Sequence, residues 1–289
     1  MRSCPKRALR LVQRLLTGKT QLERLLKPES LTNDLTEFRS YLTESDELRE
    51  DIGIFVVSDF PMDLDKIMNI LEQKKTEIAG NLGLLEIARL KLQILNQPNI
   101  ARQVTDQLAG TPVTSHKHNT LLKQLWKCMG DGSEIPTWKS LGFQNDKFPY
   151  TDFRGEGVLG LYCLLHLGLS DSEKARSLIS RTSELQFAIL SINVTRWTRT
   201  WLHDRKTTPL DHFFYDCRDS RADILRTFAA IHWSIFDIFV DFWETAGETR
   251  SVEFPMRSEE FKIKLIPVLR QLQIDQTHRG VDFPEYLSL

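Results

Sequence analysis

Residues 219–245 constrain the fold most, because a helix formed from them would be apolar on nearly every face. Apolar residues fill almost all positions between 228 and 243. The polar or small residues form one narrow stripe, made of Thr227, Ala230, Ser234, Asp237 and Asp241. A helix with so thin a polar edge is typical of the centre of a protein core. The pattern therefore predicts a central core helix.

Helical spacing of apolar residues recurs along most of the chain. It begins at Asp63, continues to Pro98 and returns at Leu121–Met129. Further helices are predicted at about 158–167, 184–204 and 257–273. Signals for strands are nearly absent, and glycine and proline are scarce, with 14 and 11 residues. We therefore predict an all-α fold.

Local signals indicate where some of these helices are separated. Residues 109–117 are rich in Gly, Thr and Ser and are interpreted as a linker. Ser170 with Glu173 forms an S-x-x-E capping box, which predicts that a helix starts there. His116 and His118 could suggest a metal site, but acidic or cysteine ligands are absent from the sequence nearby. A solvated loop is the favoured interpretation of these histidines.

Charge balance and cysteine content exclude several classes of protein. Lys and Arg number 38 against 39 Asp and Glu, so the chain lacks the basic excess of a nucleic-acid-binding protein. The chain contains no stretch of about 18 uncharged apolar residues, so no membrane span is predicted. Cys4, Cys128, Cys163 and Cys217 lack the spacing of a disulfide framework or a zinc site. We expect a reducing intracellular compartment, the cytoplasm.

Motifs of self-contained enzyme chemistry are missing. Thr17–Thr20 resemble the end of a phosphate-binding loop, but the first glycine of that motif would fall on Gln13. Asp211, His212 and Cys217 lack the signature of a nucleophile elbow. The sequence therefore predicts no metal, no cofactor and no active site of its own.

The N-terminal segment is basic and amphipathic. Residues 1–22 contain six Lys or Arg and no acid before Glu23, with leucines at near-helical spacing. Such a segment can lie on an anionic membrane, serve as a mitochondrial presequence, or dock as a helix on its own protein. The sequence leaves the three interpretations open.

Residues 138–161 combine an aromatic anchor, a turn-rich loop and a buried helix. Trp138 and Phe143 form the anchor, and Pro149 ends the approach to the loop. We expect Phe153 to pin the turn into the core. The loop is thus predicted to be braced by apolar residues at both ends.

Arg154 lies within this braced loop. Thr151 or Asp152 is placed to cap the next helix, while Gly155 and Gly157 permit close backbone approach. A cation on a rigid loop suits recognition of phosphate or carboxylate. The alternative is internal, with Arg154 paired to Asp152 or capping carbonyls inside the protein.

The spacing within this segment resembles the signature of the ELMO domain family, W-x-x-[IL]-G-F-Q followed by P-x-T-D-F-R-G-x-G-x-L-G-L. The matching residues are Trp138, Leu141, Gly142, Phe143, Gln144, Pro149, Thr151, Asp152, Phe153, Arg154, Gly155, Gly157, Leu159, Gly160 and Leu161. The resemblance covers most of the chain and is strongest at 118–261. Leu16–Lys19, with Leu22 and Arg24, is similar to the N-terminus of the short, stand-alone ELMO domain-containing members.

This resemblance implies a domain organisation. A single compact multi-helix ELMO-type domain would span 118–273. A basic amphipathic extension over 1–60 and a helical lead-in over 61–117 would precede it, and a tail over 274–289 would follow.

The resemblance also implies a function. The short members are GTPase-activating proteins for Arf and Arf-like small GTPases, and the arginine of T-D-F-R-G is their proposed catalytic residue. Carried over, that residue is Arg154, which would act as an arginine finger on a partner that itself binds GTP and Mg²⁺. The surrounding residues would support the loop or bind the partner; they are Trp138, Gly142, Phe143, Gln144, Thr151, Asp152, Phe153, Gly155 and Gly157.

Two alternatives belong to other functional classes. One is a non-catalytic scaffold or adaptor that binds small GTPases or DOCK-type exchange factors, in which Arg154 would be structural. The other is an adaptor that associates peripherally with a membrane through residues 1–24. None of these functions involves nucleic acid.

Overall fold

The computed structural model describes residues 17–28, 31, 32, 34–58, 60–204, 210–217, 220–245 and 251–271. Every regular element in these ranges is a helix, which confirms the predicted all-α fold. The chain divides between Ile100 and Ala101 into two compact units. The greater part of the basic segment, residues 1–16, and the predicted tail 274–289 lie outside the described residues.

The first unit contains short helices and the first part of a long one. They are α2 (Gln21–Leu25), α3 (Leu35–Glu44), α4 (Gly53–Val57), α5 (Leu64–Lys74) and the start of α6 (Leu82–Ala109). Thr20 and Glu23 form a capping box that begins α2. Leu22 and Leu25 are buried in the unit, where α2 packs against α3. The described end of the basic segment therefore docks on its own protein.

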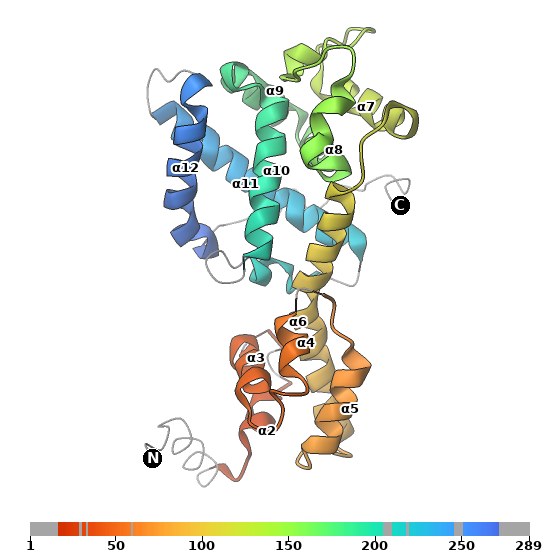
Figure 1. The fold of residues 1–289 in the computed structure, drawn as a ribbon, viewed down its shortest axis with the longest axis vertical. Coiled ribbons are helices and arrows are strands. Elements are labelled where there is room, and N and C mark those ends of the chain that lie inside the picture. Colours follow the sequence, from red (N-terminus) through yellow and green to blue (C-terminus); the bar gives the residue numbers. More distant parts are fainter. Residues whose placement is uncertain are drawn as a thin grey trace. The chain divides into compact units, whose positions relative to one another are not determined.

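The second unit contains the end of α6 and most of the longer helices (Figure 1). Its α-helices are α7 (Ser115–Met129), α8 (Gly157–Ser170), α9 (Ser172–Arg181), α10 (Phe187–His203), α11 (Arg221–Thr245) and α12 (Phe254–Leu265). Its 3₁₀ turns are η1 (Trp138–Leu141), η2 (Pro149–Gly155), η3 (Ser183–Leu185), η4 (Asp211–Phe214), η5 (Ser251–Glu253) and η6 (Ile266–Gln271).

Helix α11 is the central core helix that the sequence predicts. It crosses behind α10 in Figure 1 and packs against α8, α10 and α12. Trp233 is fully buried, and its Nε1 donates a hydrogen bond to the Cys163 carbonyl at 2.9 Å. The C-terminal part of the predicted polar stripe faces α9, where Lys174 pairs with Asp237 and Arg181 pairs with Asp241. Thr227 and Ala230, nearer the start of the stripe, are buried.

Pro98 lies inside α6, so the prediction that a helix ends there is wrong. A proline inside a helix loses one backbone hydrogen bond and costs about 3 kcal/mol. Burial of apolar residues on both sides of it, Leu92 and Leu95 before and Ala101 and Leu108 after, offsets that cost.

The predicted capping box at Ser170 is also wrong. Helix α8 continues to Ser170, whose hydroxyl donates to the His166 carbonyl at 2.6 Å. Asp171 caps α9 instead, because its carboxylate accepts from the backbone N–H of Lys174 at 2.9 Å. The helix boundary therefore lies one residue later than the motif predicts.

The predicted linker is shorter than expected, since α6 ends at Ala109 and α7 begins at Ser115. His116 and His118 consequently lie in the first turn of α7 rather than in a solvated loop. His118 is buried, and its Nδ1 accepts from the backbone N–H of Thr114 at 3.0 Å. This histidine is a structural cap.

Candidate functional site: the η2 turn and its arginine

The aromatic residues of the 138–161 segment pack between the loop and the protein core. Trp138, Phe143 and Phe153 are buried and form a continuous edge-to-face series with Trp126. Successive ring centroids are 5.8, 5.5 and 5.6 Å apart. This geometry is favourable for aromatic pairs. The backbone from η1 to η2 is therefore fixed to the core on its inner side.

Asp152 ties η2 to the preceding chain. Its carboxylate accepts from the backbone N–H of Gln144 at 2.7 Å and from that of Asn145 at 3.5 Å. Thr151 donates its hydroxyl hydrogen to the Phe148 carbonyl at 2.7 Å. The prediction that Thr151 or Asp152 caps the next helix is wrong, because both side chains hold residues that precede η2.

Three glycines stand where a side chain would collide with the backbone or with another residue. Gly142 has φ +79°, and a Cβ there would overlap the start of α10 at Phe187. Gly157 has φ +48° and faces the carbonyl of Thr111. A Cβ at Gly155 would overlap the guanidinium of Arg196. The close approach predicted for Gly155 and Gly157 is present.

Arg154 is exposed, although it follows the fully buried Phe153. Its guanidinium has no hydrogen-bond or ion-pair partner among the residues that the structure describes. The internal alternative therefore finds no support there, since Asp152 is occupied by backbone amides. The turn therefore fixes the backbone of Arg154, while its guanidinium has no partner in the described part of the chain.

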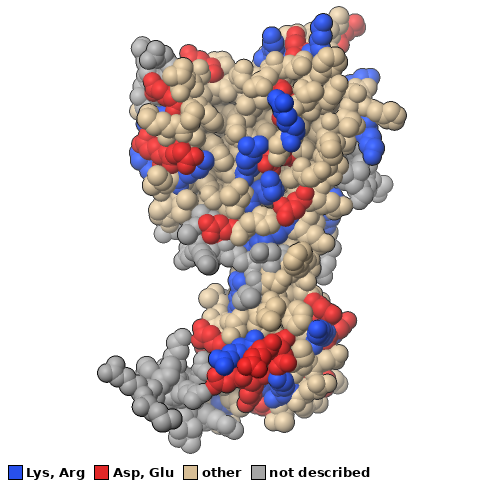
Figure 2. All heavy atoms as spheres, in the orientation of Figure 1, with Lys and Arg blue, Asp and Glu red and all other residues tan. Residues whose placement is uncertain are grey.

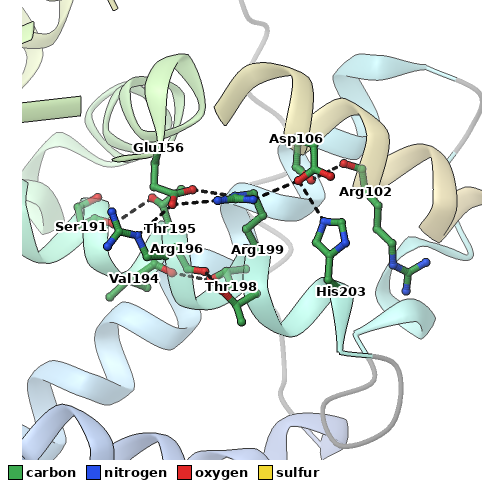
Figure 3. A network of polar contacts seen from close by, with 12 residues as sticks. Arg102, Asp106, Glu156, Ser191, Val194, Thr195, Arg196, Thr198, Arg199 and His203 are labelled. Carbon is green, nitrogen blue, oxygen red and sulfur yellow. Dashed lines mark hydrogen bonds and ion pairs between the residues drawn. The ribbon is translucent and has the colours of Figure 1, made fainter. Parts of the chain in front are cut away.

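Glu156 is the residue that the sequence reasoning missed. Its carboxylate is fully buried between two arginines of α10 (Figure 3). Oε1 lies 3.2 Å from Nε of Arg196, and Oε2 lies 2.9 Å from Nε of Arg199. Asp106 extends the network, because its Oδ1 lies 3.2 Å from Nη1 of Arg199 and 3.1 Å from Nε2 of His203. One sequence signal could have identified it. Glu156 is a charged residue at the variable position of the R-G-x-G motif, directly before an apolar helix.

Pairing explains why the carboxylate of Glu156 is tolerated in the core. An isolated buried charge is costly, and ion pairs with added hydrogen bonds compensate for it. Hydrogen bonds to Glu156 raise the pKa of Arg199, against the opposing effect of burial. The network fixes α10 against the start of α8.

Other candidate groups are used in structural contacts. Asp211 pairs with the buried Arg102, and the Cys217 sulfur lies 3.3 Å from the Thr227 hydroxyl. Across the described ranges, no group of three or more His, Cys, Asp or Glu is placed to hold a metal ion. The same ranges contain no helix whose length and apolar content would suit a membrane span.

Comparison with known proteins gives a consistent result. The ELMO/CED-12 family model matches residues 104–256. ELMO domain-containing protein 1 of Mus musculus is 28% identical over 301 residues, which cover 92% of this chain and 88% of that protein. ELMO domain-containing protein 2 of Homo sapiens is 27% identical over 197 residues, which cover 63% of this chain and 65% of that protein. No solved structure matches.

Proposed function

Because the chain belongs to the ELMO/CED-12 family, we propose that it is a GTPase-activating protein for an Arf or Arf-like small GTPase. Arg154 is the arginine finger in this proposal. The observation that carries it is the environment of Arg154, an exposed guanidinium on a turn that Phe153 and Asp152 hold in place. A finger needs both a fixed base and a free cationic head, because stabilisation is strongest when the donor is positioned in advance.

The chemistry follows from the demands of phosphoryl transfer to water. Hydrolysis needs little covalent help, and negative charge spreads over the oxygens of the transferring phosphoryl group. The planar guanidinium of Arg154 donates several hydrogen bonds to these oxygens at once. An arginine finger raises the rate by roughly 10³–10⁵, or about 4–7 kcal/mol of barrier. GTP and Mg²⁺ belong to the partner.

Single-turnover GTP hydrolysis by a panel of Arf and Arf-like GTPases tests this function. Each GTPase is loaded with GTP and mixed with buffer or with excess of this chain. We expect one or more members to hydrolyse GTP at least 10³-fold faster with the chain. If no member of the panel is accelerated while the chain remains folded, the proposal is wrong.

The proposal includes peripheral membrane contact through the basic N-terminal segment. Each basic residue near an anionic leaflet contributes about 1 kcal/mol to binding, and residues 1–22 contain six of them. Leu22 is part of the core of the first unit. Membrane contact is therefore assigned to the residues that precede Thr20.

A further inference from the structure

Arg196 reaches the η2 turn from a distant part of the chain. It is carried by α10, and its guanidinium lies against Gly155, where a Cβ would overlap Nη2. Gly155 directly follows Arg154 in the chain. Arg196 thus contacts the same turn that carries Arg154.

The two arginines that contact Glu156 use their guanidinium groups differently. Arg199 is 27% exposed and directs Nε, Nη1 and Nη2 to Glu156 and Asp106. Arg196 is 53% exposed and contacts Glu156 through Nε alone. Its terminal amino groups have no hydrogen-bond partner in the described part of the chain. Arg196 is therefore oriented through Nε, and its terminal amino groups, the outer edge of the guanidinium, keep their hydrogen-bond donors unused among the described residues.

The outer edge of Arg196 is open to a partner. Arg196 also lines an open cavity of about 500 Å³ between α10 and α12, together with Trp197, Trp201, Phe254, Ser258 and Lys262. Glu259, the acidic residue of this cavity, is paired with Lys262, whose Nζ lies 2.6 Å from its Oε1. In Figure 2, basic side chains lie exposed over α10 on the face toward the viewer.

We propose that Arg196 is a second oxyanion-binding residue of the Arg154 site. Its outer edge would bind an oxygen pair of the partner GTPase, either phosphate oxygens of the bound GTP or an acidic side chain beside them. A guanidinium recognises both groups through the same paired N–H geometry. Glu156 orients Arg196 and lowers the repulsion between neighbouring cations. This inference rests on the proposed function.

The test measures GTP hydrolysis at increasing concentrations of the chain, for wild type, Arg196→Gln and the matched control Arg176→Gln. Arg176 is exposed on α9, away from the η2 turn in sequence, and its replacement removes the same charge. We expect Arg196→Gln to lose about 10- to 100-fold in activation, the range for a charge-assisted hydrogen bond. We expect the control to match wild type.

The same titration identifies the source of the oxyanion. A lower limiting rate indicates phosphate oxygens, whereas a higher half-saturating concentration of the chain indicates an acidic side chain of the GTPase. Arg196→Lys keeps the charge opposite Glu156 and carries the test if Arg196→Gln does not fold. A folded Arg196 variant that matches the control in both quantities overturns the inference, while activation by wild type upholds the proposed function.

A second arm does not depend on any GTPase. The ¹⁵N-labelled chain is titrated with inorganic pyrophosphate, and the side-chain N–H resonances of its arginines are followed. We expect Arg196 to shift and Arg176 to stay in place. If wild type activates no GTPase, the proposed function fails, and this arm still decides the inference: an unmoved Arg196 resonance overturns it.

Discussion

Two arginines of the second unit have opposite environments. Arg102, on α6, is 1% exposed, donates from Nε to the Leu202 carbonyl at 2.8 Å and pairs with Asp211. Arg154, on η2, is exposed, and its guanidinium has no hydrogen bond or ion pair with a described residue. A buried charge must be paired to offset its desolvation. Stability accounts for the position of Arg102 but not for that of Arg154.

The two arginines differ in the exposure and pairing of their guanidinium groups, whereas the backbone that carries each of them is fixed. Phe153 is as fully buried as Arg102 itself, and Asp152 fixes the turn through two backbone amides. A flexible loop would make an exposed arginine unremarkable. On a rigid turn, an arginine with no hydrogen-bond or ion-pair partner among the described residues is consistent with the proposed binding of another molecule.

The largest expected effect is that of Arg154→Lys. Lysine keeps the charge but loses the planar fork, so we expect activation to fall at least 10³-fold. The melting temperature should not change, because Arg154 makes no contact with the described residues that its loss would break. Single-turnover hydrolysis and thermal denaturation of the variant, beside Arg176→Lys, check both statements. A stable and active Arg154→Lys protein would refute the finger assignment.

Arg102→Leu should show the opposite behaviour. Removing one partner of a buried ion pair costs about 3–5 kcal/mol, because Asp211 stays buried after its pair with Arg102 is lost. We expect a lower melting temperature and a normal activation rate per folded molecule. Replacing Asp211 by Asn in the same protein should recover part of the stability. Unchanged stability in Arg102→Leu would mean that the pair contributes nothing.

Phe153→Ala should lie between these two cases. Truncating a buried aromatic residue costs about 3–5 kcal/mol, and here the lost ring also supports the turn that carries Arg154. We expect stability and activation to fall together, as measured by chemical denaturation and by hydrolysis at a temperature where the variant is folded. Loss of activation at constant stability would make Phe153 a partner contact.

Asp152→Asn is expected to have a smaller effect on stability. The charge-assisted hydrogen bonds to Gln144 and Asn145 become neutral ones, which costs on the order of 1 kcal/mol. We expect a small drop in melting temperature and a larger relative drop in activation, because the base of Arg154 loosens. Equal activity of the variant and wild type would show that this tether does not position the arginine.

Deleting residues 1–16 should affect stability least. Those residues precede the capping box at Thr20 and the buried Leu22, which the deletion keeps. We expect sedimentation with anionic liposomes to be lost and GTP hydrolysis in solution to be unchanged. Equal binding of the full chain to neutral and anionic liposomes would contradict an electrostatic contact.

The fold was predictable where one periodic pattern dominates. The apolar residues around Trp233 predict a buried helix, and α11 is central in the second unit. The start of α9 was not predictable to the residue, because Ser170 and Asp171 are both good caps. Which of the two residues caps α9 depends on where α8 ends. Likewise, α6 passes through Pro98 because burial outweighs a local penalty.

Only those features of the site that depend on residues close together in the sequence were predictable. The spacing from Trp138 to Phe153 indicates an anchored loop, and the burial of these residues agrees with that interpretation. The ion pairs of Glu156 join residues 40 and 43 positions apart. Such pairs depend on how α8 and α10 pack, and neither helix carries that information alone. Arg196 therefore becomes a candidate only in the folded protein.

The most direct test of the central claim compares the affinity of the chain for two states of the activated GTPase. One state carries GDP with aluminium fluoride, which imitates the transferring phosphoryl group, and the other carries a non-hydrolysable GTP analogue. A finger that acts in the transition state must bind the first state at least 10²-fold more tightly. We predict that preference for wild type and its loss in Arg154→Lys. Equal affinity of wild type for both states would contradict the account.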